Sequence, residues 1–420
     1  MIRTSFNDVQ CLYIASGYLK ENETLNIRGI TLDANTMGQI NRSLISVNSK
    51  NVTLNFENVT FKNFKIDGYG SLINLVGNGA AGSTINMTNC TIENCEAKGG
   101  GGAIYINADN STLNLNNTAF NGCKSQGYGG AIYLHSNGIR INGRNNSSFN
   151  DCAAGSGYYG GAIYIENWPN CEINGENGFS FNRNRAKYGG AIYVNDNGAK
   201  ITGCQFSGNT AADSGGAIYV NGDTQITNCS FQNNSSQTYG GAMYIHRYTV
   251  NVDRCKFTGN SSKEGGALYL NSIGGIHVRD SEFYSNRANA YGGAICIYWR
   301  GNTIESCRFG GDNNARYGND IYSHASRTTY LKNCRFSRSR RAAIYGNFTI
   351  TNCQFGVSNS LNDAGQTDET AVEEAEESDA SGLATFLSNG NKIIIIVGIA
   401  IMLLAVIYAV MRSNRRKEAQ

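Results

Sequence analysis

Proline and histidine are both scarce in this chain of 420 residues, which contains one proline, Pro169, and four histidines. Because proline removes a hydrogen bond from a β-ladder, its near absence leaves long stretches of the chain free to pair as strands. The histidines share no motif that would indicate a catalytic or metal-binding centre; they are His135, His246, His277 and His324. His135 and His246 follow short apolar segments, and we expect both to be exposed at strand ends.

Carboxylates at matching repeat positions are also scarce. The nearest pair is Asp196 and Asp223, which follow similar segments, but the next comparable position holds Asn271. Acid–base catalysis or Ca²⁺ binding on a repetitive scaffold needs carboxylates gathered on adjacent repeats. We therefore expect neither an enzyme nor a cofactor or metal site, with a polysaccharide lyase or hydrolase as the alternative.

The chain is instead dominated by a short repeat, Gly-Gly-Ala-Ile-Tyr. Only Met243, Leu268 and Cys296 depart from this pattern, and the eight copies start at Gly101, Gly129, Gly160, Gly189, Gly215, Gly240, Gly265 and Gly292. A fixed period of about 20–50 residues is typical of solenoids, in which one repeat cannot bury its apolar face alone.

A second motif, Ile-x-x-Cys-x-Phe-x-x-Asn, lies between the glycine pairs, for example from Ile226 to Asn234. The Cys and Phe share a strand face, but the Ile is out of phase, which predicts a bend at the residue before the Cys. That residue is Asn228 in this copy and Gly203 or Asp280 in others, all of which tolerate left-handed backbone.

Cysteine and phenylalanine recur at fixed positions in this second motif. We expect them to form a buried structural column with unpaired thiols; its members are Cys204, Phe206, Cys229, Phe231, Cys255, Phe257, Cys307, Phe309, Cys334 and Phe336. The earlier cysteines are less regularly spaced, and a disulfide among them is not excluded by the pattern. They are Cys90, Cys95, Cys123, Cys152 and Cys171.

These segments are short, alternate with period two and are bounded by Gly, Asn and Ser, so they indicate strands. We infer an all-β fold with three strands per turn: a parallel β-helix of about 12 or 13 coils over residues 25–357, since repeats of roughly 26 residues fill that range. The handedness of parallel crossovers favours a right-handed coil. Residues 1–24 are expected to form a cap or irregular segment and contain no apolar run resembling a signal peptide.

The repeated Tyr should point outward, because the flanking Ile and Val share the inward face. Aromatic rings with hydroxyl edges suit contact with protein or sugar. The alternative is that the rings only stack on one another to cover the sheet. This candidate interaction face comprises Tyr105, Tyr133, Tyr164, Tyr193, Tyr219, Tyr244 and Tyr269.

The composition changes after the repeats. Residues 358–391 are acidic and predict a disordered linker. Residues 392–411 are almost entirely apolar and predict a transmembrane helix. The tail, residues 412–420, is basic, and the positive-inside rule places it in the cytoplasm with the β-helix outside; its orienting charges are Arg412, Arg415, Arg416 and Lys417.

The alternation of Gly-Gly-Ala-Ile with Phe-x-x-Asn, as in Gly215–Ile218 with Phe231–Asn234, resembles the repeats of chlamydial polymorphic membrane proteins. That resemblance implies a right-handed β-helix on the cell surface with a role in adhesion to host cells. The bacterial proteins end in an outer-membrane barrel, whereas the predicted single span resembles the surface proteins of eukaryotic microbes that carry such repeats.

These features together predict a single-pass protein of the plasma membrane. Its expected partners are the bilayer and a host-cell protein or glycan. No nucleic-acid motif accompanies the mildly basic repeats. A purely structural or antigenic coat remains an alternative function.

Overall fold

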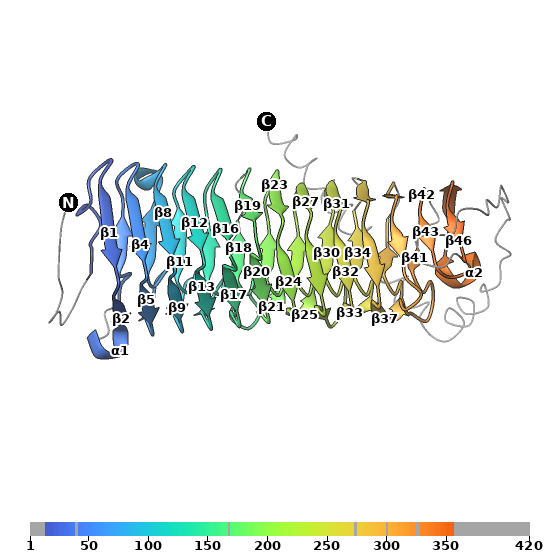
Figure 1. Cartoon of the computed structure of the whole chain (residues 1–420), viewed down its shortest axis with the longest axis horizontal. Helices are drawn as coiled ribbons and strands as arrows, with labels where there is room; N and C mark the ends of the chain where they lie inside the picture. Colours follow the sequence, from blue (N-terminus) through green and yellow to red (C-terminus); the bar gives the residue numbers. More distant parts are fainter. Residues whose placement is uncertain are drawn as a thin grey trace, which may run out of the picture. The chain divides into compact units, whose positions relative to one another are not determined.

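The computed structural model describes residues 13–356, except 38–40, 167–168, 273–274, 300 and 325–327. Within them the chain winds as a β-solenoid in which strands of successive turns stack side by side, from β1 to β46 (Figure 1). Every strand pair between turns is parallel, as in the pairing of β26 (Ile218–Val220) with β30 (Met243–His246). The predicted parallel β-helix is therefore confirmed over this part of the chain.

Three long sheets run the length of the solenoid. The tyrosine sheet has 12 strands and carries the Gly-Gly-Ala-Ile-Tyr motif. The asparagine sheet has 13 strands, from β1 (Thr24–Arg28) through β27 (Thr224–Thr227) to β45 (Phe348–Thr351). The phenylalanine sheet also has 13, from β2 (Thr31–Asp33) through β28 (Ser230–Gln232) to β46 (Gln354–Phe355). The chain makes about 11 full turns between the first and last of the 12 tyrosine-sheet strands, slightly fewer than the predicted 12 or 13 coils.

The tyrosine sheet carries the candidate site. In spatial order its strands are β3 (Ile45–Val47), β7 (Ile73–Val76), β11 (Ile104–Asn107), β15 (Ile132–Leu134), β18 (Ile163–Ile165), β22 (Ile192–Val194), β26, β30, β34 (Leu268–Asn271), β38 (Ile295–Ile297), β41 (Ile321–Ser323) and β44 (Ile344–Tyr345).

The prediction of three strands per turn is incomplete, because a fourth strand follows the phenylalanine sheet in many turns. These short strands form two smaller sheets. One contains β6 (Lys65–Ile66), β10 (Glu96–Ala97) and β14 (Lys124–Ser125); the other contains β21 (Arg185–Tyr188), β25 (Thr210–Ser214), β29 (Ser235–Ser236), β33 (Ser261–Glu264) and β37 (Arg287–Tyr291). Their two to five residues are mostly polar, so no apolar alternation marks them in the sequence.

The corners fall where the sequence predicted bends. The residue before the cysteine has a left-handed backbone, with φ of 54° at Asn228, 67° at Gly203 and 48° at Asp280. The first glycine of each pair is also left-handed, as at Gly215, where φ is 68° and an added Cβ would lie 2.3 Å from the Ile218 carbonyl oxygen. Glycine is therefore needed at this corner for both its φ and its lack of a side chain.

The interior is filled by stacked like residues. Phe206 lies over Phe231 with ring centroids 4.9 Å apart and planes 5° from parallel, and the inward aliphatics Ile218 and Val220 are fully buried. All the described cysteines are free, and all except Cys353 are buried. The thiols and rings of the second motif therefore lie in a buried column, and no disulfide links the described cysteines.

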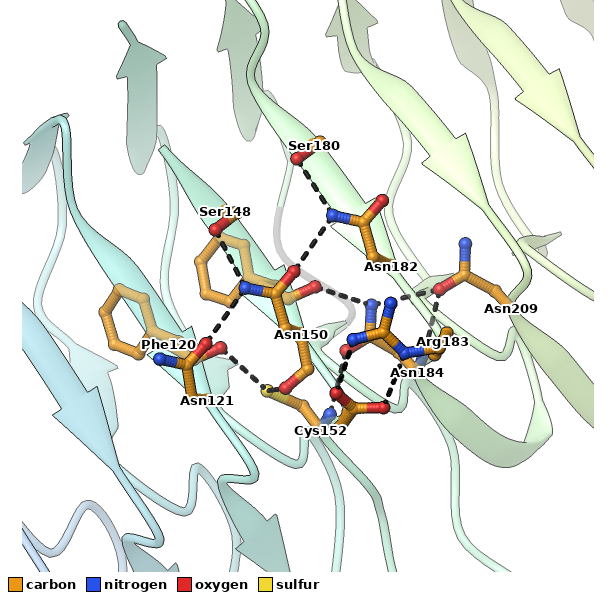
Figure 2. Close-up of polar contacts among 12 residues, drawn as sticks. Phe120, Asn121, Ser148, Asn150, Cys152, Ser180, Asn182, Arg183, Asn184 and Asn209 are labelled. Carbon is orange, nitrogen blue, oxygen red and sulfur yellow. Dashed lines mark hydrogen bonds and ion pairs between the residues drawn. The ribbon is translucent and has the colours of Figure 1, made fainter. Parts of the chain in front are cut away.

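Asparagine side chains form ladders along the stack (Figure 2). On the outer surface, Asn150 Nδ2 donates to Asn121 Oδ1 and Asn182 Nδ2 donates to Asn150 Oδ1, both at 2.9 Å. Inside, Asn184 Nδ2 donates to Asn209 Oδ1 at 3.0 Å, and the same bond recurs on each following turn to Asn313. The inner ladder supplies hydrogen bonds to backbone groups at a buried corner, where water cannot.

The two α-helices among the described residues are α1 (Ala34–Met37) and α2 (Arg340–Ala343), near the two ends of the solenoid. Within that part of the chain, no helix combines the length and apolarity needed to cross a bilayer. The predicted linker at 358–391, membrane span at 392–411 and basic tail at 412–420 lie outside the described residues. The orienting charges of that tail, Arg412, Arg415, Arg416 and Lys417, lie outside them as well.

Candidate binding surface on the tyrosine sheet

The outer face of the tyrosine sheet carries three parallel columns of side chains. The central column holds the motif tyrosines in register, for example Tyr193, Tyr219 and Tyr244. A corner column, formed by the residues just before the glycine pairs, includes Tyr128, Tyr159, Tyr188, Tyr239, Glu264, Tyr291 and Tyr317. A polar column lies two residues after the central one and includes Asn107, His135, Glu166, Asn195, Asn221, His246, Asn271, Tyr298 and His324.

The predicted tyrosines lie on the outer face, but most of them are covered by neighbouring rings. Tyr133, Tyr164, Tyr193, Tyr244 and Tyr269 are only 4–8 % exposed, whereas Tyr105 and Tyr219 are half-buried. Rings of the corner column fold over them: Tyr159 stacks on Tyr193 with centroids 4.8 Å apart. The corner tyrosines are the residues that sequence reasoning missed, although their position just before each glycine pair was visible.

Burial controls the chemistry of these hydroxyls. It raises the pKa of Tyr188 to about 12, with a further contribution from the charge of Asp213. Burial and the hydrogen bond to the Glu166 carboxylate raise the pKa of Tyr133 far above its ordinary range. The hydroxyls therefore stay protonated and act as hydrogen-bond donors rather than as bases.

The polar column accepts or supplies the hydrogen bonds of the central rings. Tyr133 Oη donates to Glu166, which also contacts His135 Nδ1. Asn271 Nδ2 donates to Tyr244 Oη at 2.7 Å. Burial, with the nearby charge of Arg247, lowers the pKa of His246. His135 and His246 lie at strand ends as predicted, but they are half-buried members of this column rather than exposed residues.

Several large rings remain accessible around this surface. Tyr69 is 45 % exposed and Tyr158 39 %, while Tyr298 and Trp299 are 46 % and 44 % exposed. Tyr158 packs edge-on against Tyr128 of the corner column, with centroids 5.0 Å apart. Tyr298 packs edge-on against Trp299 at 5.4 Å. The outer face therefore combines a covered aromatic layer with exposed rings at three places, Tyr69, Tyr158, and Tyr298 with Trp299.

Cys296 replaces a central tyrosine, and Glu264 of the preceding turn occupies a corner position. The ligand atoms of Glu264, Cys296 and His324 lie within 4.8 Å of one another. Glu264 Oε2 and His324 Nε2 are 3.8 Å apart, and their side chains are 12 % and 27 % exposed. Burial, together with the charge of Glu264, raises the pKa of the Cys296 thiol.

The two aspartates that came nearest to a catalytic pair do not form one. Asp196 is buried, accepts a hydrogen bond from the Cys171 N–H at 3.0 Å, and has its pKa raised to about 6 by desolvation. Asp223 is exposed and accepts from the Thr249 N–H at 2.9 Å. An added Cβ at Gly222 would lie 1.9 Å from the Asp196 carbonyl oxygen, so Gly222 is the residue stacked on Asp196. The two carboxylates are therefore one position out of register.

A polar groove of about 480 Å³ lies on the outer face of the asparagine sheet. Its floor is an asparagine ladder in which each amide donates to the residue one turn earlier, at 2.8–3.1 Å; the members that line it are Asn86, Asn114, Asn142 and Asn174. Arg144 and Glu176 also line the groove. Because the amides bond to one another, the groove offers fewer free donors than its composition suggests.

A family model described as the right-handed β-helix region matches residues 171–309. Together with the parallel stacking above, this match confirms the predicted right-handed β-helix repeat. The matched segment contains Glu264 and Cys296 and ends before His324. No curated protein and no solved structure gave a significant match.

Proposed function

We propose that this chain is a non-enzymatic interaction module that binds an extended acidic polysaccharide along the outer face of the tyrosine sheet. The observation that carries the proposal is the set of aligned columns on that face, in which columns of aromatic rings run beside a column of polar side chains from turn to turn. Aromatic rings pack against apolar faces of a ligand, and polar edges supply hydrogen bonds. A ligand that itself repeats is suited to a surface that repeats at about 4.8 Å per turn.

Charge favours an acidic polymer over a neutral one. Residues 1–357 contain 30 of the 35 Lys and Arg and 23 of the 32 Asp and Glu, a net charge of about +7. The other nine acidic residues are eight in the linker and Glu418 in the tail. A moderate positive charge raises the rate and affinity of association with an anion, and salt weakens that effect.

The apolar segment at 392–411 and the basic tail support a place for this module at the plasma membrane, with the β-helix on the outer side. The resemblance to chlamydial polymorphic membrane proteins supports a role in adhesion, with host-cell glycans as the ligand class. A host-cell protein as partner and a structural coat both predict no binding to the polymers in the experiment below. A polysaccharide lyase predicts cleavage of them.

The test measures binding of the full-length chain to alginate and chondroitin sulfate, with uncharged dextran as the comparison. Replacing the exposed rings Tyr158, Tyr298 and Trp299 by Ala should weaken binding by about tenfold or more, because each lost aromatic contact is worth about 1 kcal/mol. The matched control is Tyr330→Ala, which removes a ring that is 41 % exposed on the asparagine sheet and should leave binding unchanged.

Equal affinity of the triple variant and the wild type would remove the tyrosine sheet as the binding surface. Binding to none of the polymers would contradict the ligand class. Release of unsaturated or shortened products from either acidic polymer would instead support the lyase or hydrolase alternative.

A further inference from the structure

The interruption in the tyrosine columns places three different metal-ligating side chains together. Glu264, Cys296 and His324 come from three consecutive turns, since Cys296 pairs with Tyr269 of the turn before it and with Tyr322 of the turn after it. Glu264 belongs to the turn of Tyr269, and His324 to the turn of Tyr322. The three residues therefore form a diagonal across the corner, central and polar columns.

Other diagonals on this face show what such a line of residues normally does. A corner tyrosine packs against the central tyrosine of the next turn, as Tyr239 does against Tyr269 with centroids 4.4 Å apart. A central tyrosine then bonds to the polar residue of the turn after it, as Tyr244 does to Asn271 at 2.7 Å. In the line from Glu264 through Cys296 to His324, both of these tyrosines are missing, and a carboxylate, a thiol and an imidazole meet instead.

We propose that Glu264, Cys296 and His324 form a binding site for a zinc-class divalent cation. Sulfur, imidazole nitrogen and carboxylate oxygen are the ligands that Zn²⁺ takes in proteins, and three protein ligands leave the fourth tetrahedral position to water. The 4.8 Å limit on the separations of the ligand atoms is somewhat longer than a tetrahedral zinc site needs. Small side-chain rotations close that difference, because bond lengths of about 2.0–2.3 Å set the ligands roughly 3.5 Å apart.

The surroundings also fit a metal site. Cys296 is fully buried at its base, while the His324 side chain is 27 % exposed and gives the ion a path of entry. The rings of Tyr291 and Tyr322 pack against the His324 imidazole, with centroids 5.0 and 4.6 Å away, and fix its orientation. On binding, the thiol gives its proton to solvent and the thiolate becomes the sulfur ligand.

The test is a titration of the full-length chain with Co²⁺, which reports sulfur ligation through a thiolate-to-metal charge-transfer band, and with Zn²⁺ as the competitor. The wild type should bind one ion per chain with this band, and Zn²⁺ should abolish it. Cys296→Ser should lose the band. Glu264→Gln and His324→Ala should each weaken binding by at least about tenfold, since loss of a residue that merely orients a ligand already costs about 10–100-fold.

Two further variants separate metal binding from folding. Cys296→Tyr restores the repeat pattern and should fold without binding the ion. His246→Ala is the matched control: this histidine has the same column position as His324, but Tyr188 and Tyr219 occupy the other two places on its diagonal. It should bind as the wild type does. Absence of the band in the wild type, its retention in Cys296→Ser, or an equal loss in His246→Ala would overturn the proposal.

Discussion

The inner asparagine ladder provides the sharpest test of what holds the solenoid together, and Asn234 is its best-defined member. Its Oδ1 accepts from Asn209 N and Nδ2, at 3.0 and 2.9 Å, and its Nδ2 donates to the Phe206 carbonyl and to Asn260 Oδ1, at 3.1 and 3.0 Å. Asn234→Ala removes all four bonds and leaves the buried Asn209 N–H without this acceptor.

Four buried hydrogen bonds at about 0.5–1.5 kcal/mol each predict a loss of about 2–6 kcal/mol in the free energy of unfolding. The comparison is Asn221→Ala, which removes a single, half-buried bond from Asn221 Nδ2 to Asn195 Oδ1 at 2.7 Å. Its expected cost is about 0.5–1.5 kcal/mol.

The assay is urea unfolding of both variants and the wild type, followed by circular dichroism at the same protein concentration. Hydrogen exchange of the Asn209 amide gives a local readout, because that amide should exchange faster in Asn234→Ala and unchanged in Asn221→Ala. If the two variants lose the same free energy of unfolding, the inner ladder does not contribute more to stability than a single half-buried hydrogen bond.

Three further predictions follow from single residues. Because burial raises the pKa of Asp196 to about 6 from 3.8, the folded state binds this proton more tightly than the unfolded state. The stabilisation that comes from protonated Asp196 is therefore fully present below about pH 4 and is lost as the pH rises through 6. At 1.36 kcal/mol per pKa unit, the free energy of unfolding falls by about 3 kcal/mol over this range. Asp196→Asn should remove this slope from urea midpoints measured between pH 4 and 7, and an unchanged slope would contradict the assignment. Gly29→Ala should lower the free energy of unfolding by about 1–2 kcal/mol, because Gly29 is left-handed but an added Cβ there meets nothing within 4 Å. Gly215→Ala should lower the urea midpoint further, because its added Cβ would clash with the backbone. Equal midpoints for the two variants would contradict this difference. Alkylation mapped by mass spectrometry should label Cys353 in the native chain and the buried Cys229 only after unfolding, whereas disulfide-linked peptides from native protein would contradict free thiols.

The backbone path was largely predictable because its signals are local. The corner before the cysteine was predicted from residue type alone, and the structure gives a positive φ to each of Asn228, Gly203 and Asp280. The stacking of Phe on Phe followed from the period of the repeat. The fourth strand was missed because segments such as Ser235–Ser236 are too short and polar to show a period.

The surface was less predictable because it depends on how side chains of different turns meet. Inward and outward faces could be assigned from alternation, but alternation does not show that Tyr159 folds over Tyr193. In the same way, Glu264, Cys296 and His324 are 32 and 28 residues apart, and only the register of three turns brings them together. The sequence did show that cysteine replaces the motif tyrosine at Cys296. Only the structure shows that this position lies next to Glu264 and His324.

The claim that the tyrosine sheet is the functional face is tested most directly by a hydrogen-exchange footprint of the full-length chain with and without bound chondroitin sulfate. The expected result is protection of the corner at Tyr158 and of the strand end at Tyr298, with no change over the asparagine groove at Asn114 and Asn142. Protection confined to that groove would contradict the assignment.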